Sequence, residues 1–362
     1  MRPGLLFRRD FLALASMAGV SVVFAPVRRA AAGPPSPNPY AATRPGQFSP
    51  AVAGIPERVY VPNTKSNTVD VIDPATFTRV GHFPVGATPH HITPSWDLRR
   101  LYVTNTWGNS LTVIDPRTAT PTETIAVANP YNLYFTLDGT RALVVAEREW
   151  RLDVRDPHTW ALLAEIPVPW AGVDHLDFSA DGRFLLASCE YSGVVVKVDT
   201  RALRLVGSLR VGGLPVDVRL SPDGELFYVA NQGRHGVSVI DPVALREVAF
   251  LPTGKGAHGL QVSRDARLLY VSNRLAGSIS VIECAARRVA DTWHVGGSPD
   301  MLQLSPDGRY LWTSNRFGDT VSVVDTRAGT LHRTIHVGAG PHGLAYFPQP
   351  GRLCLGHNGV YR

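Results

Sequence analysis

The sequence predicts an all-β protein built from seven copies of a unit of about 42 residues. The main observation is a short segment, Tyr-Val-x-Asn in its clearest copies, that recurs along most of the chain. Its copies end at positions 63, 105, 147, 190, 231, 273, 315 and 358, with spacings of 41 to 43 residues. Such a regular period indicates a repeat architecture and overrides the two or three domains that 362 residues would otherwise suggest.

The second observation is that each unit contains four short segments rich in β-branched residues. One unit has such segments at 216–220, 228–231 and 237–241, and the fourth runs to a Val-Gly pair. Turn residues separate the segments, as in Ser-Pro-Asp-Gly at 221–224 and 305–308. No amphipathic helical period follows residue 32. Four antiparallel strands per unit, repeated around a ring, predict a seven-bladed β-propeller.

On these motifs, the chain resembles the YVTN-repeat seven-bladed β-propellers over residues 55–358. The resemblance implies that the first strand of each blade lines a central channel. Because the first unit begins at its second strand, Tyr60, we expect residues 344–347 to complete the N-terminal blade and close the ring. Residues 353–358 form an eighth copy of the second strand, for which no position in the ring remains open.

The N-terminus predicts an export signal. Arg8 and Arg9 precede an apolar run from Phe11 to Val27, which Arg28-Arg29-Ala30-Ala31-Ala32 follows. The arginine pair with Phe and Leu behind it resembles the twin-arginine class. We therefore expect a cleaved signal peptide at 1–32, an extended proline-rich linker at 33–54 and the propeller at 55–362, with the mature protein periplasmic, in the cell envelope or extracellular, and not bound to a membrane.

Charge and cysteine content exclude some function classes. The formal net charge is +6, but cleavage after Ala32 would remove five arginines and one aspartate and leave +2. A charge this small, without a basic run, argues against nucleic-acid binding. The three cysteines, Cys189, Cys284 and Cys354, occupy non-equivalent repeat positions, so we expect buried thiols and no disulfide framework. We expect a monomer.

Candidate functional residues lie in loops that vary between units, on one face of the ring. The loop after Val-Gly gives one set of equivalent positions: His90, Tyr131, Asp174, Val216, His258, Asp300 and His342. The next position gives His91, Asn132, His175, Asp217, Gly259, Met301 and Gly343. The position after the Asn slot adds Arg148, Arg274 and Arg316, and nearby aromatic residues include Trp107 and Trp150. Glu147 and Glu190 replace the Asn and are expected to be solvated substitutions.

Three interpretations of this channel mouth remain open. In the first, the polar residues stabilise the turns of the loops and bind water in the channel. In the second, zinc or a similar divalent transition metal is bound by His90, His258, Asp300 and His342. In the third, the mouth binds a small anion through its arginines, with a tryptophan stacked on the ligand. The expected ligand-binding residues are His90, His91, Asp174, His175, Asp217, Arg148, Arg274, Arg316, Trp107 and Trp150.

The sequence contains no haem-attachment, Walker, nucleophile-elbow or Cys-x-x-Cys motif. We therefore predict an exported binding or interaction scaffold without chemistry of its own, whose partner is a small anionic ligand or a protein. The alternative is a metal-dependent hydrolase or lyase acting on a small anionic or cyclic substrate. In that enzyme the metal would polarise the substrate while His91 or His175 moved a proton.

Overall fold

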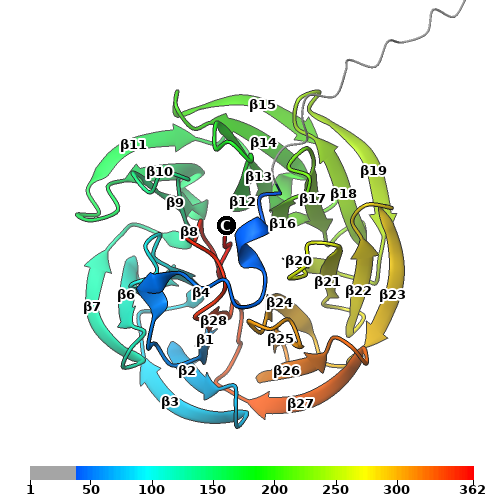
Figure 1. Cartoon of the computed structure of the whole chain (residues 1–362). Helices are drawn as coiled ribbons and strands as arrows, with labels where there is room; N and C mark the ends of the chain where they lie inside the picture. Colours follow the sequence, from blue (N-terminus) through cyan, green and yellow to red (C-terminus); the bar gives the residue numbers. More distant parts are fainter. Residues whose placement is uncertain (1–37) are drawn as a thin grey trace, which may run out of the picture. The chain divides into compact units, whose positions relative to one another are not determined.

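The computed structural model describes residues 38–362, which form a ring of seven four-stranded antiparallel sheets (Figure 1). The predicted fold class is confirmed. The predicted signal peptide at 1–32 lies outside the described residues, as do residues 33–37 of the predicted linker. No helix in the described part of the chain is long and apolar enough to cross a membrane.

The strands of the first four blades, in sheet order, have the following bounds. Blade 1 contains β28 (Ala345–Phe347), β1 (Arg58–Asn63), β2 (Thr68–Asp73) and β3 (Thr78–Pro84). Blade 2 contains β4 (Pro89–Pro94), β5 (Leu101–Asn105), β6 (Ser110–Asp115) and β7 (Thr120–Ala126). Blade 3 contains β8 (Pro130–Phe135), β9 (Ala142–Ala146), β10 (Arg151–Arg155) and β11 (Leu162–Pro167). Blade 4 contains β12 (Val173–Phe178), β13 (Phe184–Cys189), β14 (Val194–Asp199) and β15 (Arg204–Arg210).

The remaining blades repeat the same order. Blade 5 contains β16 (Pro215–Leu220), β17 (Phe227–Asn231), β18 (Gly236–Asp241) and β19 (Arg246–Pro252). Blade 6 contains β20 (Ala257–Val262), β21 (Leu268–Asn273), β22 (Ser278–Glu283) and β23 (Arg288–His294). Blade 7 contains β24 (Pro299–Leu304), β25 (Tyr310–Asn315), β26 (Thr320–Asp325) and β27 (Thr330–His336). The helical segments described are short 3₁₀ turns: η1 (Ala41–Thr43), η2 (Pro50–Val52), η3 (Glu147–Glu149) and η4 (Glu190–Ser192).

The ring closes through blade 1, as the repeat pattern predicts. β28 pairs antiparallel with β1, with Val59 opposite Tyr346 and Tyr60 opposite Ala345. The N-terminal blade therefore takes its innermost strand from the C-terminal part of the chain. This closure gives blade 1 the four strands that every other blade has.

The repeated Asn fixes the loops that carry the candidate site. In blade 6, Nδ2 of Asn273 donates to Ser278 and Ser280 on the next strand, at 3.1 and 3.0 Å. Its Oδ1 accepts the backbone N–H of Gly254 at 3.0 Å, in the loop that leads into this blade. A Cβ on Gly254 would lie 2.8 Å from the Asn273 side chain, so this close approach requires glycine. The repeated Asn thus connects the loop after the second strand with the loop that leads into the same blade, and both loops lie on one face of the propeller.

The C-terminal segment after β28 enters the channel instead of forming a blade strand (Figure 1, red). Phe135 N–H donates to Leu355 at 2.8 Å, and His357 N–H donates to Leu133 at 3.1 Å, so the segment lies against β8. We call residues 351–362 the plug. The eighth Tyr-Val-x-Asn-like copy at 353–358 is therefore part of the plug, because every second-strand position in the ring is already filled.

Residues 38–54, expected as an extended linker, form η1 and η2 and pack on the propeller. Tyr40 is buried, and its hydroxyl donates to the Leu220 carbonyl at 2.7 Å. Phe48 forms a parallel bridge with Gly351 of the plug. The segment is therefore held against the propeller and the plug through Tyr40 and Phe48, although its proline-rich composition predicted an extended linker.

The three cysteines are buried and unpaired, as predicted. Burial raises the pKa of each thiol to about 12. Thiols with such a pKa are poor nucleophiles at neutral pH.

Candidate functional site

The structure brings the predicted histidines together around the channel axis. His90 and His91 lie on β4, His175 on β12 and His258 on β20, while His342 precedes β28. Ring centroids of neighbouring pairs lie 4.7 Å (His91–His342) to 6.5 Å (His175–His258) apart. Equivalent positions on separate blades converge here because the first strand of every blade faces the channel.

One group at the mouth consists of His258, Asp300 and His342, whose candidate donor atoms all lie within 4.8 Å of one another. The sequence placed His90 with them as a fourth ligand, but His90 is outside this group, and its Nδ1 lies 2.6 Å from Oγ1 of Thr106. Metal binding by these residues stays a prediction.

Arg274 lies against the same group. Its Nε donates to Oδ1 of Asp300 at 2.9 Å, and its Nη2 contacts both Asp300 and His258. Nδ1 of His258 lies 2.9 Å from the same carboxylate oxygen. Burial alone would raise the pKa of Asp300, but Arg274 and His258 more than offset it and hold that pKa well below its usual range. A guanidinium thus occupies the position beside the carboxylate where a cation would be held.

Arg316 is the second arginine of the mouth and is half-buried. Its Nη1 donates to Thr64 Oγ1 at 2.9 Å and to the Gly340 carbonyl at 3.3 Å. No carboxylate among residues 38–362 lies within 4.0 Å of its guanidinium nitrogens. Burial lowers the pKa of His90 to about 3, and Arg316 adds to this lowering. The side of the mouth around Arg316 therefore carries positive charge that no ion pair neutralises.

Acidic residues gather on the other side of the mouth. Glu147 and Glu190, expected as solvated substitutions, are half-buried in η3 and η4. Burial, reinforced by the charge of Asp174, raises the pKa of Glu147 to about 7 and that of Glu190 to about 8. They are only partly solvated, because the short 3₁₀ turns at the Asn position place them close to the buried Asp174. The mouth is therefore asymmetric, with Arg274 and Arg316 on one side and Glu147, Glu190 and Asp174 on the other.

Exposed aromatic side chains surround these charges. Trp107, Trp150, Tyr191 and Phe317 are 61, 50, 65 and 65% exposed, and all lie in loops after second strands. Arg148 lies over the Trp107 ring at 4.0 Å and donates from Nε to Asn129 at 2.9 Å. Exposed aromatic residues clustered on one face are typical of interaction sites.

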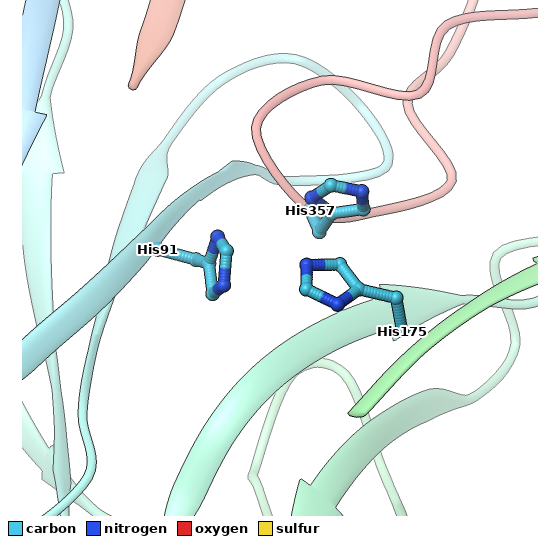
Figure 2. Close-up of side chains that lie close together, drawn as sticks. All are labelled: His91, His175 and His357. Carbon is cyan, nitrogen blue, oxygen red and sulfur yellow. The ribbon is translucent and has the colours of Figure 1, made fainter. Parts of the chain in front are cut away.

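A second group of histidines lies deeper in the channel: His91, His175 and His357 (Figure 2). All three are fully buried, with candidate donor atoms within 4.8 Å of one another. The sequence indicated His91 and His175 but missed His357. Its place in the eighth Tyr-Val-x-Asn-like copy, the one without a slot in the ring, was the signal that could have drawn attention to it.

Asp217 does not face the mouth as a free ligand group. Its carboxylate accepts the backbone N–H groups of Val218 and Leu260, at 2.9 and 2.8 Å. It also lies 3.1 Å from Nε2 of His357 and 3.8 Å from Arg219. Burial would raise its pKa, but Arg219 and His357 hold that pKa well below its usual range. Asp217 thus links two neighbouring blades to the plug.

These features define a seven-bladed β-propeller with a charged, aromatic-rimmed channel mouth and a histidine-rich channel. The chain belongs to the YNCE-like beta-propeller family, whose model matches residues 29–350. The match ends immediately before the plug. No curated protein is significantly similar in sequence.

Several solved structures share the fold at low sequence identity. Hydrazine synthase from Kuenenia stuttgartiensis is 20% identical, with a TM-score of 0.61 over 70% of this chain and 88% of that one. The dihydro-heme d1 dehydrogenase NirN is 18% identical, with a TM-score of 0.63 over 86% of this chain and 78% of that one. The periplasmic gluconolactonase PpgL from Pseudomonas aeruginosa is 20% identical, with a TM-score of 0.66 over 81% and 99%. Identities this low show the fold alone.

Proposed function

We propose that this protein is an exported binding protein that takes a small organic anion at the channel mouth. The observation that carries the proposal is Arg316, a half-buried guanidinium with no carboxylate within 4.0 Å among the described residues. A guanidinium held this way is suited to a carboxylate or phosphate, which it can contact with two parallel hydrogen bonds.

The surroundings of Arg316 favour an anion that also has an apolar part. Phe317, the next residue, is 65% exposed, and its ring lies 6.0 Å from the Arg274 guanidinium. An exposed ring close to the Arg274 guanidinium and next in sequence to Arg316 provides a surface for a carbon skeleton. On the other side of the mouth, Glu147 and Glu190 have pKa values raised to about 7 and about 8, so at neutral pH their protonated forms can donate hydrogen bonds to hydroxyl groups of the ligand.

Substitution of Arg316 tests this proposal. Gluconate and inorganic phosphate are the probes, and binding is measured by isothermal titration calorimetry. Arg316→Gln should weaken binding about 10-fold or more, because it removes a charge-assisted hydrogen-bond pair. Arg117→Gln, an exposed arginine in a turn after a third strand, is the matched control and should leave the affinity unchanged. Equal affinities for wild type and Arg316→Gln, or no binding of either probe, would contradict an anion site at Arg316.

Export by the twin-arginine route is the second part of the proposal and rests on Arg8, Arg9 and the following apolar run. Replacing both arginines by lysine should leave the protein inside the cell, although charge is conserved. Fractionation followed by immunoblotting measures this, and N-terminal sequencing of the exported wild type should begin at Gly33. Export of the doubly substituted chain at the wild-type level would exclude the twin-arginine route.

The alternative, a metal-dependent hydrolase or lyase built on His90, His258, Asp300 and His342, has less support. Arg274 contacts both Asp300 and His258, so a divalent cation there would meet a neighbouring positive charge. The geometry of the mouth therefore favours binding of an anion over binding of a cation.

A further inference from the structure

The plug brings a third histidine to two that the blades already hold. His91 comes from β4 in blade 2, His175 from β12 in blade 4 and His357 from the plug. Figure 2 shows the three rings, from three separate segments, facing one another. Their centroids lie 5.1 Å (His91–His175), 5.4 Å (His91–His357) and 4.6 Å (His175–His357) apart.

A tight turn of the backbone sets the position of His357. Val360 N–H donates to the Gly356 carbonyl at 2.8 Å, and Leu355 N–H donates to the Val360 carbonyl at 2.7 Å. Gly356 has φ +157°, and a Cβ there would lie 2.1 Å from the Tyr134 ring. Only glycine therefore lets the turn sit against β8 and place His357 on the channel axis.

Each imidazole contacts a polar group through one nitrogen. Nδ1 of His91 lies 3.2 Å from Oδ1 of Asn358, and Nδ1 of His175 lies 2.7 Å from Oδ1 of Asp174. Nε2 of His357 lies 3.1 Å from Oδ1 of Asp217 and 3.1 Å from Nη2 of Arg219. An oxygen acceptor beside one ring nitrogen can orient the imidazole and leave the other nitrogen to act as a ligand. Asn358 lies in this position beside His91, and Asp217 does so beside His357 in the tautomer whose Nε2 carries the proton, while Asp174 makes a close charge contact with His175 and no hydrogen bond.

The remaining nitrogens have no partner. Nε2 of His91, Nε2 of His175 and Nδ1 of His357 are buried and make no hydrogen bond. Burying an unpaired polar atom is costly. One ring nitrogen from each of the three histidines lies within 4.8 Å of the other two, so a single partner could satisfy them together. Imidazole nitrogens converging in this way are ligands that zinc and similar ions prefer.

We infer that His91, His175 and His357 form a three-histidine site for one divalent transition metal ion of the zinc class. Asp174 and Asp217, behind two of the ligands, supply negative charge that offsets the charge of the ion, with Arg219 paired to Asp217. The site differs from the mouth group of His258, Asp300 and His342 in all its ligands. It also needs the plug, which follows the part of the chain that matches the family model.

The test uses the full chain, purified, stripped with a chelator and titrated with Co²⁺ as a spectroscopic probe, then loaded with Zn²⁺ for elemental analysis. Wild type should bind one equivalent and develop visible ligand-field absorption. His357→Gln should weaken binding about 100-fold or more, because it removes a ligand. Asn358→Ala should weaken binding about 10-fold, because it removes only the side chain that orients His91. His158→Gln, an exposed histidine outside the channel, is the control and should bind as wild type does.

Three results would overturn the inference. The first is binding of less than about a tenth of an equivalent of metal by wild type, and the second is unchanged binding by His357→Gln. The third is loss of the metal in His258→Gln but not in His357→Gln, because that result would place the ion at the mouth. Thermal unfolding and circular dichroism verify that each variant is folded. If His357→Gln does not fold, X-ray absorption of zinc-loaded wild type decides, since fewer than three imidazole ligands would reject the site.

Discussion

Deletion of residues 352–362 should lower the free energy of unfolding by on the order of 5 kcal/mol, because the plug fills the channel with buried side chains. Leu355, Val360 and Tyr361 of this segment are at most 5% exposed, and the side chains that line the channel lose their contacts with them when the segment is removed. Urea unfolding followed by tryptophan fluorescence measures the change. Arg352→Ala, an exposed residue of the same segment, is the control and should change stability by less than about 0.5 kcal/mol.

The ionic part of this loss can be separated from the packing part. Nη2 of the terminal Arg362 lies 2.9 and 2.8 Å from the two carboxylate oxygens of buried Asp177. Asp177→Ala and Arg362→Ala should each destabilise the protein, while the double variant should lose less than the sum, with a coupling of about 1–3 kcal/mol. Full additivity would mean that the Asp177–Arg362 pair does not contribute to stability, and a truncated chain as stable as wild type would mean that the plug does not support the ring.

Asp300→Ala should destabilise the protein by about 3–5 kcal/mol, because it leaves a mostly buried guanidinium without its carboxylate. Asp300 is fully buried, and the Arg274 side chain is 13% exposed. The strand pairing of β20 with β21 and of β24 with β25 runs through the backbone, so we expect the loss to be electrostatic rather than a failure to form the sheets. Urea unfolding at pH 7 measures it, and the exposed Glu225→Ala should have no effect beyond about 0.5 kcal/mol.

The contribution of Asp300 to stability has a defined pH dependence. The pKa of Asp300 is held well below its usual range, so its contribution to stability is present above the unfolded-state pKa of about 3.9 and is lost as the pH falls below that value. The stability difference between wild type and Asp300→Asn should therefore shrink as the pH is lowered from 7 toward 3. A difference that is constant over this range would show that the ion pair with Arg274 does not carry the effect.

Ring closure and loop placement could be predicted from the sequence because they follow from the period of the repeat. Tyr60 begins the first unit at a second strand, so a strand from the C-terminus had to complete blade 1, and residues 345–347 do so. The same period aligned His90, His258 and His342 at one position of the ring. Local strand patterns fix such features, since each residue's place depends only on its own unit.

Contacts across the channel could not be predicted in this way. The period placed His90 with the mouth group, yet its side chain turns to Thr106, and Arg274 contacts Asp300 and His258. The composition of the proline-rich segment at 38–54 did not predict that Tyr40 packs against the propeller. The Arg362 guanidinium lies 4.3 Å from the aromatic ring of Tyr40. Such contacts join residues far apart in the sequence, and side-chain rotamers decide them.

The sequence by itself determined seven blades, the strand that closes them, the loops on each face and which histidines share a level of the ring. Only the tertiary structure decided what occupies the channel. The plug repeats the second-strand pattern, but those positions are all paired within the blades, so it enters the channel and pairs in part with β8. That placement brings His357 to His91 and His175. The period of the repeat aligns His91 with His175 at one position of the first strand, but His357 belongs to a second-strand copy, so the period does not predict that it joins them.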